Sequence, residues 1–140
     1  MRNKLYLLIP VLIISFLLTG CIEDYRRETI ESAKDEAEAV VEDYLDCLME
    51  EDFDEAAKYS YVEEDYDRLP DMSNAYLRVT GIYESSTSSD FYVTVEVSSP
   101  DVSAETVLIY MGYEKISREW WVNTSTYSGT AAEQIAKILR

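Results

Sequence analysis

Apolar side chains recur at steps of three and four over residues 29–50, which is the period of an α-helix. This spacing predicts one long amphipathic helix, because it places every apolar side chain on the same face. The stripe consists of Ile30, Ala33, Ala37, Val40, Val41, Tyr44, Leu45 and Leu48, and acidic residues fill the opposite face. A shorter helix is expected next, capped by Asp52 or Asp54, with Phe53, Ala56, Ala57 and Ser60 or Tyr61 inward. Residues 63–74 are expected to form a loop.

The pattern changes to strict alternation in the second half of the chain. Four strands are expected, at residues 76–83, 91–97, 107–113 and 119–126, followed by a short amphipathic helix at 131–139. Serine, proline and hairpin-length connections separate these strands, which favours an antiparallel meander. The expected fold class is therefore α+β. A long and a short helix pack on a curved antiparallel sheet of about four strands, and a short C-terminal helix completes the fold.

The N-terminal segment has the features of a targeting sequence. Arg2 and Lys4 precede 14 residues, 5–18, that are almost entirely apolar, which is shorter than the ~20 residues of a membrane-spanning helix. The run ends in Leu18-Thr19-Gly20-Cys21. This tetrapeptide resembles the lipobox of prokaryotic lipoproteins. The resemblance implies that Cys21 receives a lipid and becomes the mature N-terminus; the alternative is an ordinary anchor with a coincidental cysteine.

Three segments follow from the lipobox resemblance. Residues 1–20 are a signal peptide, 21–27 a lipidated N-terminus with a short tether, and 28–140 a single α+β domain. The expected location is the cell membrane, with the lipid-anchored domain facing outside the cytoplasm. Two acyl chains suffice for stable anchoring.

Charge and composition exclude several functions. The chain has 28 acidic and 12 basic residues and no histidine, so triads or zinc sites that need imidazole are absent. The portion from Cys21 onward has a side-chain charge of −18 (10 − 28), concentrated in residues 23–71, where it is −15 (5 − 20). Nucleic acid is not an expected partner, because binding phosphates requires a basic surface. With Cys21 lipidated, Cys47 has no cysteine partner for a disulfide.

The order of elements resembles the nuclear-transport-factor-2-like, or cystatin-like, α+β superfamily. The likeness covers about residues 28–127. It rests on the segment Asp52-Phe53-Asp54-Glu55-Ala56-Ala57 and on the hairpin from Tyr113-Glu114-Lys115 to Arg118-Glu119-Trp120-Trp121-Val122. Glu51 stands where the family pattern has glycine, and Ser117-Arg118-Glu119 departs from its Gly-Lys-Trp strand. The resemblance implies a cone-like sheet around the helix that either holds a small apolar ligand or carries a protein partner or homodimer.

Two features are candidate sites. Tyr44 lies on the apolar stripe, where it either forms an acid/base pair with a carboxylate such as Asp46 or Glu96 or simply packs in the core. Trp120 and Trp121 are adjacent, so on a strand they point to opposite faces. One is expected in the core. The other is either an exposed candidate for binding a ligand or partner, or is also buried, with one of the two under the C-terminal helix.

No catalytic residue, cofactor or metal site is assigned from the sequence. The acidic runs at 50–55 and 63–67 lack the spacing of a calcium-binding loop and are expected to be solvated. The expected function is that of a non-enzymatic cell-envelope lipoprotein that binds a ligand or protein at the membrane surface. Two alternatives remain: an isomerase or dehydratase that uses a pocket carboxylate and tyrosine, and an acidic cation-binding surface protein.

Overall fold

The computed structural model describes residues 29–86 and 90–140. The chain divides into two compact units, residues 1–33 and 34–140. Of the first unit only residues 29–33 are described, and they are helical. The second unit contains the rest of the long helix, all four strands and the remaining helices.

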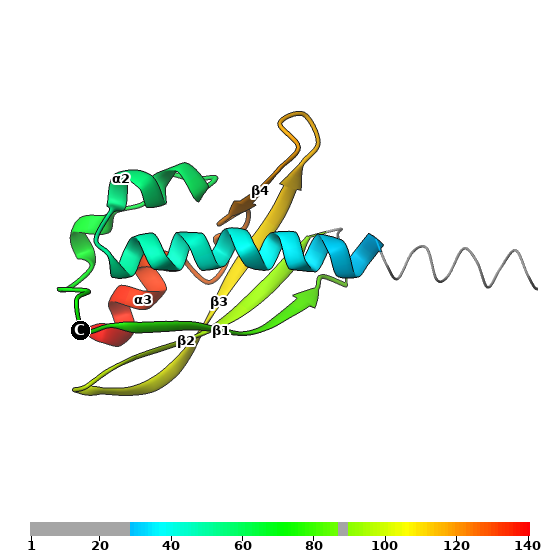
Figure 1. The fold of residues 1–140 in the computed structure, drawn as a ribbon. Helices are drawn as coiled ribbons and strands as arrows, with labels where there is room; N and C mark the ends of the chain where they lie inside the picture. The colour runs from blue at the N-terminus through cyan, green and yellow to red at the C-terminus, as the bar shows by residue number, and fades with distance from the viewer. Residues whose placement is uncertain (1–28, 87–89) are drawn as a thin grey trace, which may run out of the picture. The chain divides into compact units, whose positions relative to one another are not determined.

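The long helix spans residues 29–49 and is drawn in blue to cyan in Figure 1. Within the second unit its buried positions confirm the expected stripe: Ala37, Val41, Tyr44, Leu45 and Leu48. The helix is terminated by Glu51, two residues beyond its last helical position, which adopts the left-handed backbone conformation with φ 59. The N–H groups of Glu51 and Asp52 donate to the carbonyls of Leu48 and Cys47, the pattern of a Schellman cap.

Two short helical segments and a loop follow. The helix α2 spans Phe53–Ala56, and its N-cap is Asp52, whose side chain accepts from the Glu55 N–H. A 3-10 turn covers Ala57–Tyr59. Ser60 is the buried member of the expected alternatives Ser60 or Tyr61, and Tyr61 is exposed. Ala57 is also exposed, so its inward assignment is wrong. The 3-10 geometry rotates side chains away from the α-helical period on which that assignment depended.

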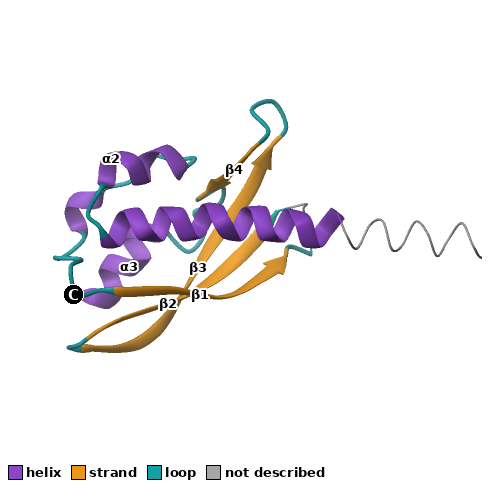
Figure 2. Cartoon of the chain, in the orientation of Figure 1, coloured by secondary structure: helices purple, strands orange, loops and turns teal. Residues whose placement is uncertain are grey.

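The sheet has four antiparallel strands in the order β1-β2-β3-β4 (Figure 2). The strands are β1 (Tyr76–Glu84), β2 (Phe91–Ser99), β3 (Val102–Glu114) and β4 (Glu119–Val122). Strand β3 begins five residues earlier than expected, because Ser99 and Val102 pair directly across a tight turn. Strand β4 ends at Val122 rather than at residue 126, because Asn123 has a φ of 61 and leaves the extended conformation.

The core lies on the inner face of the sheet, between it and the helices. Buried residues alternate along β2 and β3, namely Phe91, Val93, Val95, Val97, Val107, Ile109 and Met111. The helix α3 (Ala131–Leu139) buries Ala131, Ala132, Ile135 and Ala136. It begins with a capping box in which Thr130 and Glu133 satisfy each other's backbone N–H groups.

The side chain of Gln134 in α3 replaces a missing strand partner. Its Oε1 accepts from the N–H of Leu108 at 3.1 Å, and its Nε2 donates to the carbonyl of the same residue at 2.7 Å. Strand β4 stops before it reaches this part of β3, so the amide satisfies backbone groups that β4 leaves unpaired.

The expected α+β class, the four-stranded antiparallel sheet and the short C-terminal helix are confirmed. The sheet is open, since β1 and β4 do not pair with each other. Within residues 29–86 and 90–140, no helix is both long and apolar enough to cross a bilayer.

Candidate functional site

The carboxylate of Glu64 is the centre of a polar cluster beside the core. Its Oε1 accepts from the Tyr44 hydroxyl at 2.7 Å, from the Asn123 side-chain amide at 2.7 Å and from the Tyr66 hydroxyl at 3.3 Å. Its Oε2 accepts from the backbone N–H of Ala132 at 2.9 Å. Glu64 therefore joins the long helix, the loop before β1, the segment after β4 and the first turn of α3.

Asn123 completes this cluster from the other side. Its Nδ2 also donates to the Ser60 hydroxyl at 2.8 Å, and its Oδ1 accepts from the Ala131 N–H at 2.8 Å. All three polar contacts of this buried amide are within the protein. Asparagine tolerates the left-handed backbone at this position better than most residues. The strand therefore ends where its last side chain can turn inward.

The electrostatics of the cluster keep its phenols protonated. Burial raises the pKa of Tyr44 well above its usual value, and the charge of Glu64 raises it further. Burial and then Glu64 raise the pKa of Tyr66 in the same way. Tyr44 is completely buried. These hydroxyls act as hydrogen-bond donors to the carboxylate, and a substrate has no direct access to Tyr44.

The expected carboxylate partners of Tyr44 are wrong. Asp46 is exposed on the opposite side of the helix, and Glu96 pairs with Arg78 on the outer face of the sheet at 3.2 Å. The long helix turns the Tyr44 hydroxyl toward the loop at 63–67 instead, where Glu64 is the residue it meets. The alternative expectation, that the phenol packs in the core and its hydroxyl finds a partner, matches the observed contacts.

Trp120 and Trp121 point to opposite faces of β4. Trp120 stacks on the buried Phe91 at 5.1 Å and lies against Tyr113 at 5.3 Å on the inner face. Trp121 lies beside Gly112 in the pairing register and meets Tyr61 edge-on at 6.4 Å. Both indoles are half-buried rather than one buried and one exposed. Each has a buried Nε1–H with no hydrogen-bond partner in the described part of the chain.

Trp121 belongs to a row of aromatic side chains on the outer face of the sheet. Tyr83, Tyr92 and Tyr110 are cross-strand neighbours there, because each alternates with inward residues of its strand. Tyr83 stacks on Tyr92 at 5.3 Å, and Trp121 is the diagonal neighbour of Tyr110. We call Tyr61, Tyr83, Tyr92, Tyr110 and Trp121 the aromatic band.

Backbone geometry helps to position the band. The ring of Tyr83 lies over Gly81, where an added Cβ would be 2.6 Å from the Tyr83 hydroxyl. The β1–β2 register shifts between Val79 and Gly81, so the glycine lies at an irregularity of the strand. The exposed fractions of Tyr61 and Tyr83 are 61% and 47%. The band therefore presents aromatic surface to solvent.

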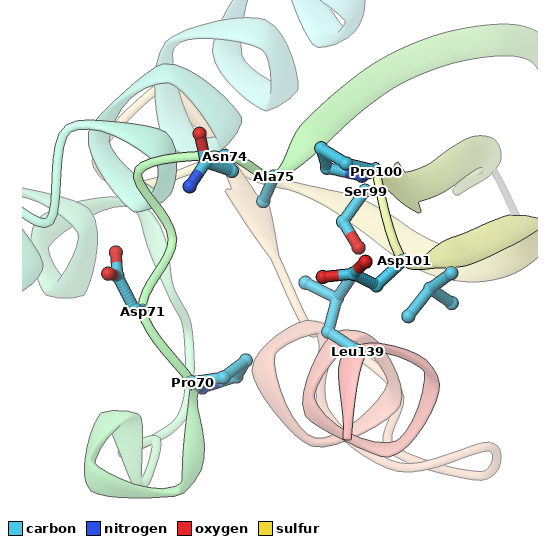
Figure 3. A pocket seen from close by; sticks show the side chains of 9 residues that line it. Pro70, Asp71, Asn74, Ala75, Ser99, Pro100, Asp101 and Leu139 are labelled. Carbon is cyan, nitrogen blue, oxygen red and sulfur yellow. The ribbon is translucent and has the colours of Figure 1, made fainter.

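A cleft of about 360 Å³ lies elsewhere, beside the C-terminal end of α3 (Figure 3). Ser99 and Asp101 point into it from the β2–β3 turn, and Leu139 lines it from α3. Asp71 and Asn74 border it on the side of the loop before β1. Hydrogen bonds from the side chain and then the backbone N–H of Ser73 lower the pKa of Asp71. Two aspartates and no basic residue line the cleft, so its lining is acidic.

The remaining candidates are a thiol and the acidic runs. Cys47 is a half-buried free thiol, and burial followed by the charge of Asp52 raises its pKa, which lowers its reactivity. Among residues 29–86 and 90–140, no three carboxylates or thiols lie close enough together to hold a metal ion. Cys21 and the lipobox lie outside the described residues.

No protein-family model matches the chain, and no similar protein was found among curated proteins or solved structures.

The sequence did not identify Glu64, Asn123, Ser60 or Tyr66 as a cluster. Glu64 is one of four acids in residues 63–67, and nothing in that run distinguishes it from its solvated neighbours. Asn123 follows the aromatic strand and is the one available signal, since asparagine at the end of a strand favours a left-handed turn.

Proposed function

We propose that this protein is a lipid-anchored, extracytoplasmic binding domain with no catalytic role. Its anchor is a lipid on Cys21, and its binding surface is the aromatic band. We propose a fold of the nuclear-transport-factor-2-like kind. The α+β class and the open antiparallel sheet are compatible with this role. The observation that carries the proposal is the exposure of Tyr61 and Tyr83 beside three half-buried aromatic residues, Tyr92, Tyr110 and Trp121, on one sheet face.

The polar cluster supports binding over catalysis. A general base must reach its substrate with a free lone pair, whereas the carboxylate of Glu64 accepts four hydrogen bonds from the fold itself. Tyr44 is fully buried behind it. The hydrogen bonds of the cluster connect separate segments of the fold, which is a structural role.

The partner class is best matched by a protein with an apolar surface of its own. Tyrosine and tryptophan supply large contact area together with a polar group, which is why both are enriched in protein interfaces. The charge distribution agrees, because residues 72–140, which include the whole sheet, carry only −3 (5 − 8), against −15 for residues 23–71. A partner at the sheet avoids most of the chain's negative charge.

The anchor is tested by metabolic labelling of cells with an alkyne analogue of palmitate. We expect the label on the wild-type protein and on Cys47→Ser, and its loss in Cys21→Ser. Cys47→Ser is the matched control, because it removes the second of the two cysteines. Label that persists in Cys21→Ser would contradict the anchor.

The binding surface is tested by a photo-crosslinking amino acid placed at Tyr92, with Glu105 as the control position. Glu105 is exposed on β3 and lies outside the band. After irradiation of intact cells, we expect one discrete adduct from position 92, none from position 105, and its loss when Trp121→Ser is added. Native mass spectrometry that finds a bound small molecule in both the wild type and Trp121→Ser would favour a pocket ligand instead.

A further inference from the structure

The turn between β3 and β4 carries an unusual set of side chains for this chain. Residues 115–118, which we call the hairpin tip, are Lys115, Ile116, Ser117 and Arg118. Ile116 is 93% exposed, and every residue from 113 to 119 is exposed. In Figure 1 the turn stands clear of the helices and of the other strand ends. The tip is therefore an apolar side chain held in solvent between two cations.

The two cations of the tip differ in their contacts from three other basic residues of the domain. Lys58, Arg68 and Arg78 each lie within 4 Å of a carboxylate. Lys115 and Arg118 form no such pair within residues 29–86 and 90–140. Glu114 lies at the base of the turn, where it accepts from the Ser117 hydroxyl at 2.9 Å. Within the described residues, the tip therefore presents two cations that no carboxylate neutralises by direct contact.

The position of the tip relates it to the start of the domain. Within residues 34–140, the long helix runs from the end of the sheet where the hairpin tip lies toward the end where α3 lies (Figure 1). The chain thus enters this unit on the side of the tip (Figure 1). Cys21 precedes the start of the long helix at residue 29 by eight residues (29 − 21), a length that reaches at most about 29 Å when fully extended. A lipid on Cys21 would therefore keep the domain close to the bilayer.

We propose that the hairpin tip inserts into the headgroup region of the membrane that carries the lipid anchor, with Ile116 entering the apolar boundary and Lys115 and Arg118 contacting anionic headgroups. This inference rests on the proposed lipid anchor. An apolar side chain flanked by cations is the composition of interfacial membrane contacts. Glu114 and Glu119 lie opposite each other in the strand register at the base of the hairpin. Their charges limit the depth of membrane insertion to the turn itself.

A single turn is too small a contact to hold the domain at a membrane without the lipid anchor. Once a lipid holds the domain at the surface, the second contact becomes intramolecular and forms at a high effective concentration. The result is an orientation: the long axis of β3 and β4 points at the bilayer, and the aromatic band faces sideways, where a partner can approach. The released domain is expected to show no measurable affinity for vesicles.

The test uses the full-length lipidated chain in vesicles of phosphatidylcholine and phosphatidylglycerol at three to one. An environment-sensitive fluorophore is placed on Ser117→Cys, or on Ser103→Cys as a control near the β2–β3 turn, both in a Cys47→Ala background. With nitroxide-labelled lipids we expect at least twofold quenching at position 117 and none at position 103. Equal quenching by the nitroxide lipids at positions 117 and 103 of vesicle-bound protein would overturn the proposal.

Two variants separate the side chains involved. Ile116→Ser should remove the quenching, whereas Tyr127→Ser should leave it unchanged, because Tyr127 is also 93% exposed but lies outside the tip. Replacing Lys115 and Arg118 together by Ser should reduce quenching most in phosphatidylglycerol-rich vesicles, and high salt should mimic this effect. Quenching that survives both the Ile116→Ser and the double replacement would also overturn the proposal.

Flotation of the same samples distinguishes this inference from the anchor. Protein that fails to float with vesicles contradicts the anchor and the tip contact together. Protein that floats without quenching at position 117 overturns the tip contact alone. A fluorophore shielded from water only in native envelopes, and not in pure lipid vesicles, would assign the tip to a protein partner and overturn the membrane contact.

Discussion

Tyr44 and Glu64, twenty residues apart in the sequence, meet through a 2.7 Å hydrogen bond from the phenol to the carboxylate. The contact fixes the long helix to a loop that has almost no regular structure of its own. The same carboxylate holds the segment after β4 and the start of α3. One side chain thus determines how several segments pack.

Glu64→Gln should destabilise the domain by about 2–4 kcal/mol, because an amide nitrogen would face one of the four donors and leave it unsatisfied. Urea denaturation at neutral pH measures the change. Glu63→Gln is the control, since Glu63 is exposed beside it, and it should change stability by less than about 0.5 kcal/mol. Similar stabilities for the two variants would show that the cluster has no structural role.

Alkaline pH should weaken the fold through Tyr44. In the unfolded chain a tyrosine ionises near pH 10, whereas burial holds the pKa of Tyr44 well above that value in the fold. Above about pH 10 the unfolded state has therefore lost a proton that the folded state keeps, and stability falls as pH rises. Tyr44→Phe should make this fall shallower, with some slope remaining because the pKa of Tyr66 is also raised.

The measurement for Tyr44 is thermal unfolding between pH 7.5 and 11. At pH 7.5 Tyr44→Phe should cost about 1–2 kcal/mol, because the hydrogen bond to a carboxylate is lost. Tyr127→Phe removes an exposed phenol and should follow the wild type throughout. An unchanged alkaline slope in Tyr44→Phe would show that other groups determine it.

Replacements of Asn123 should separate its hydrogen bonds from its backbone conformation. Asn123→Ala loses all the polar contacts of the amide and keeps a φ of 61 that alanine disfavours. We expect a loss of about 3 kcal/mol. Asn123→Gly loses the same bonds without the backbone strain, so it should be about 1 kcal/mol less destabilising than alanine. The opposite order in chemical denaturation would contradict the left-handed assignment.

The two tryptophans should respond differently to truncation. Trp120→Ala removes an indole stacked on the buried Phe91 and should cost about 2–4 kcal/mol. Trp121→Ala acts on the outer face, where we expect a cost of about 1 kcal/mol together with loss of the crosslinked adduct at position 92. Differential scanning calorimetry compares the two. A larger loss of stability for Trp121 would place the band within the folded core rather than at a binding surface.

Glu51 provides a further test at the end of the long helix. Its Oε1 accepts from the Met72 N–H at 3.0 Å, and its backbone is left-handed. Glu51→Ala loses the hydrogen bond and keeps the strain, so it should cost about 1–2 kcal/mol. Glu51→Gly relieves the strain and offsets most of that loss. Equal thermal midpoints for Glu51→Ala and the wild type would contradict this account.

Most of the fold follows from periodicity along the chain. The stripe of the long helix, the alternation in β2 and the limits of α3 depend on local spacing, and local spacing is what a sequence displays directly. The end of β4 does not follow from local spacing. It depends on the left-handed backbone of Asn123 and on the carboxylate of Glu64, nearly sixty residues away.

The polar cluster was beyond prediction for a related physical reason. A hydrogen bond between a loop carboxylate and a helix phenol has no period, and Glu64 stands among acids with the same local composition. The sequence did place Trp120 and Trp121 on opposite faces, because strand alternation alone determines that. Their half-burial depends on Phe91, Tyr113 and Tyr61, which tertiary packing brings to them.

The cluster at Glu64 also has a consequence for the timing of folding. Two of its four donors, Asn123 and the N–H of Ala132, come late in the chain. During synthesis the long helix and the loop that carries Glu64 are therefore made well before these two donors. Contacts between residues so far apart in the sequence form slowly. The cluster can be complete only after residue 132 has been synthesised. Until then the carboxylate of Glu64 lacks two of its four hydrogen-bond donors.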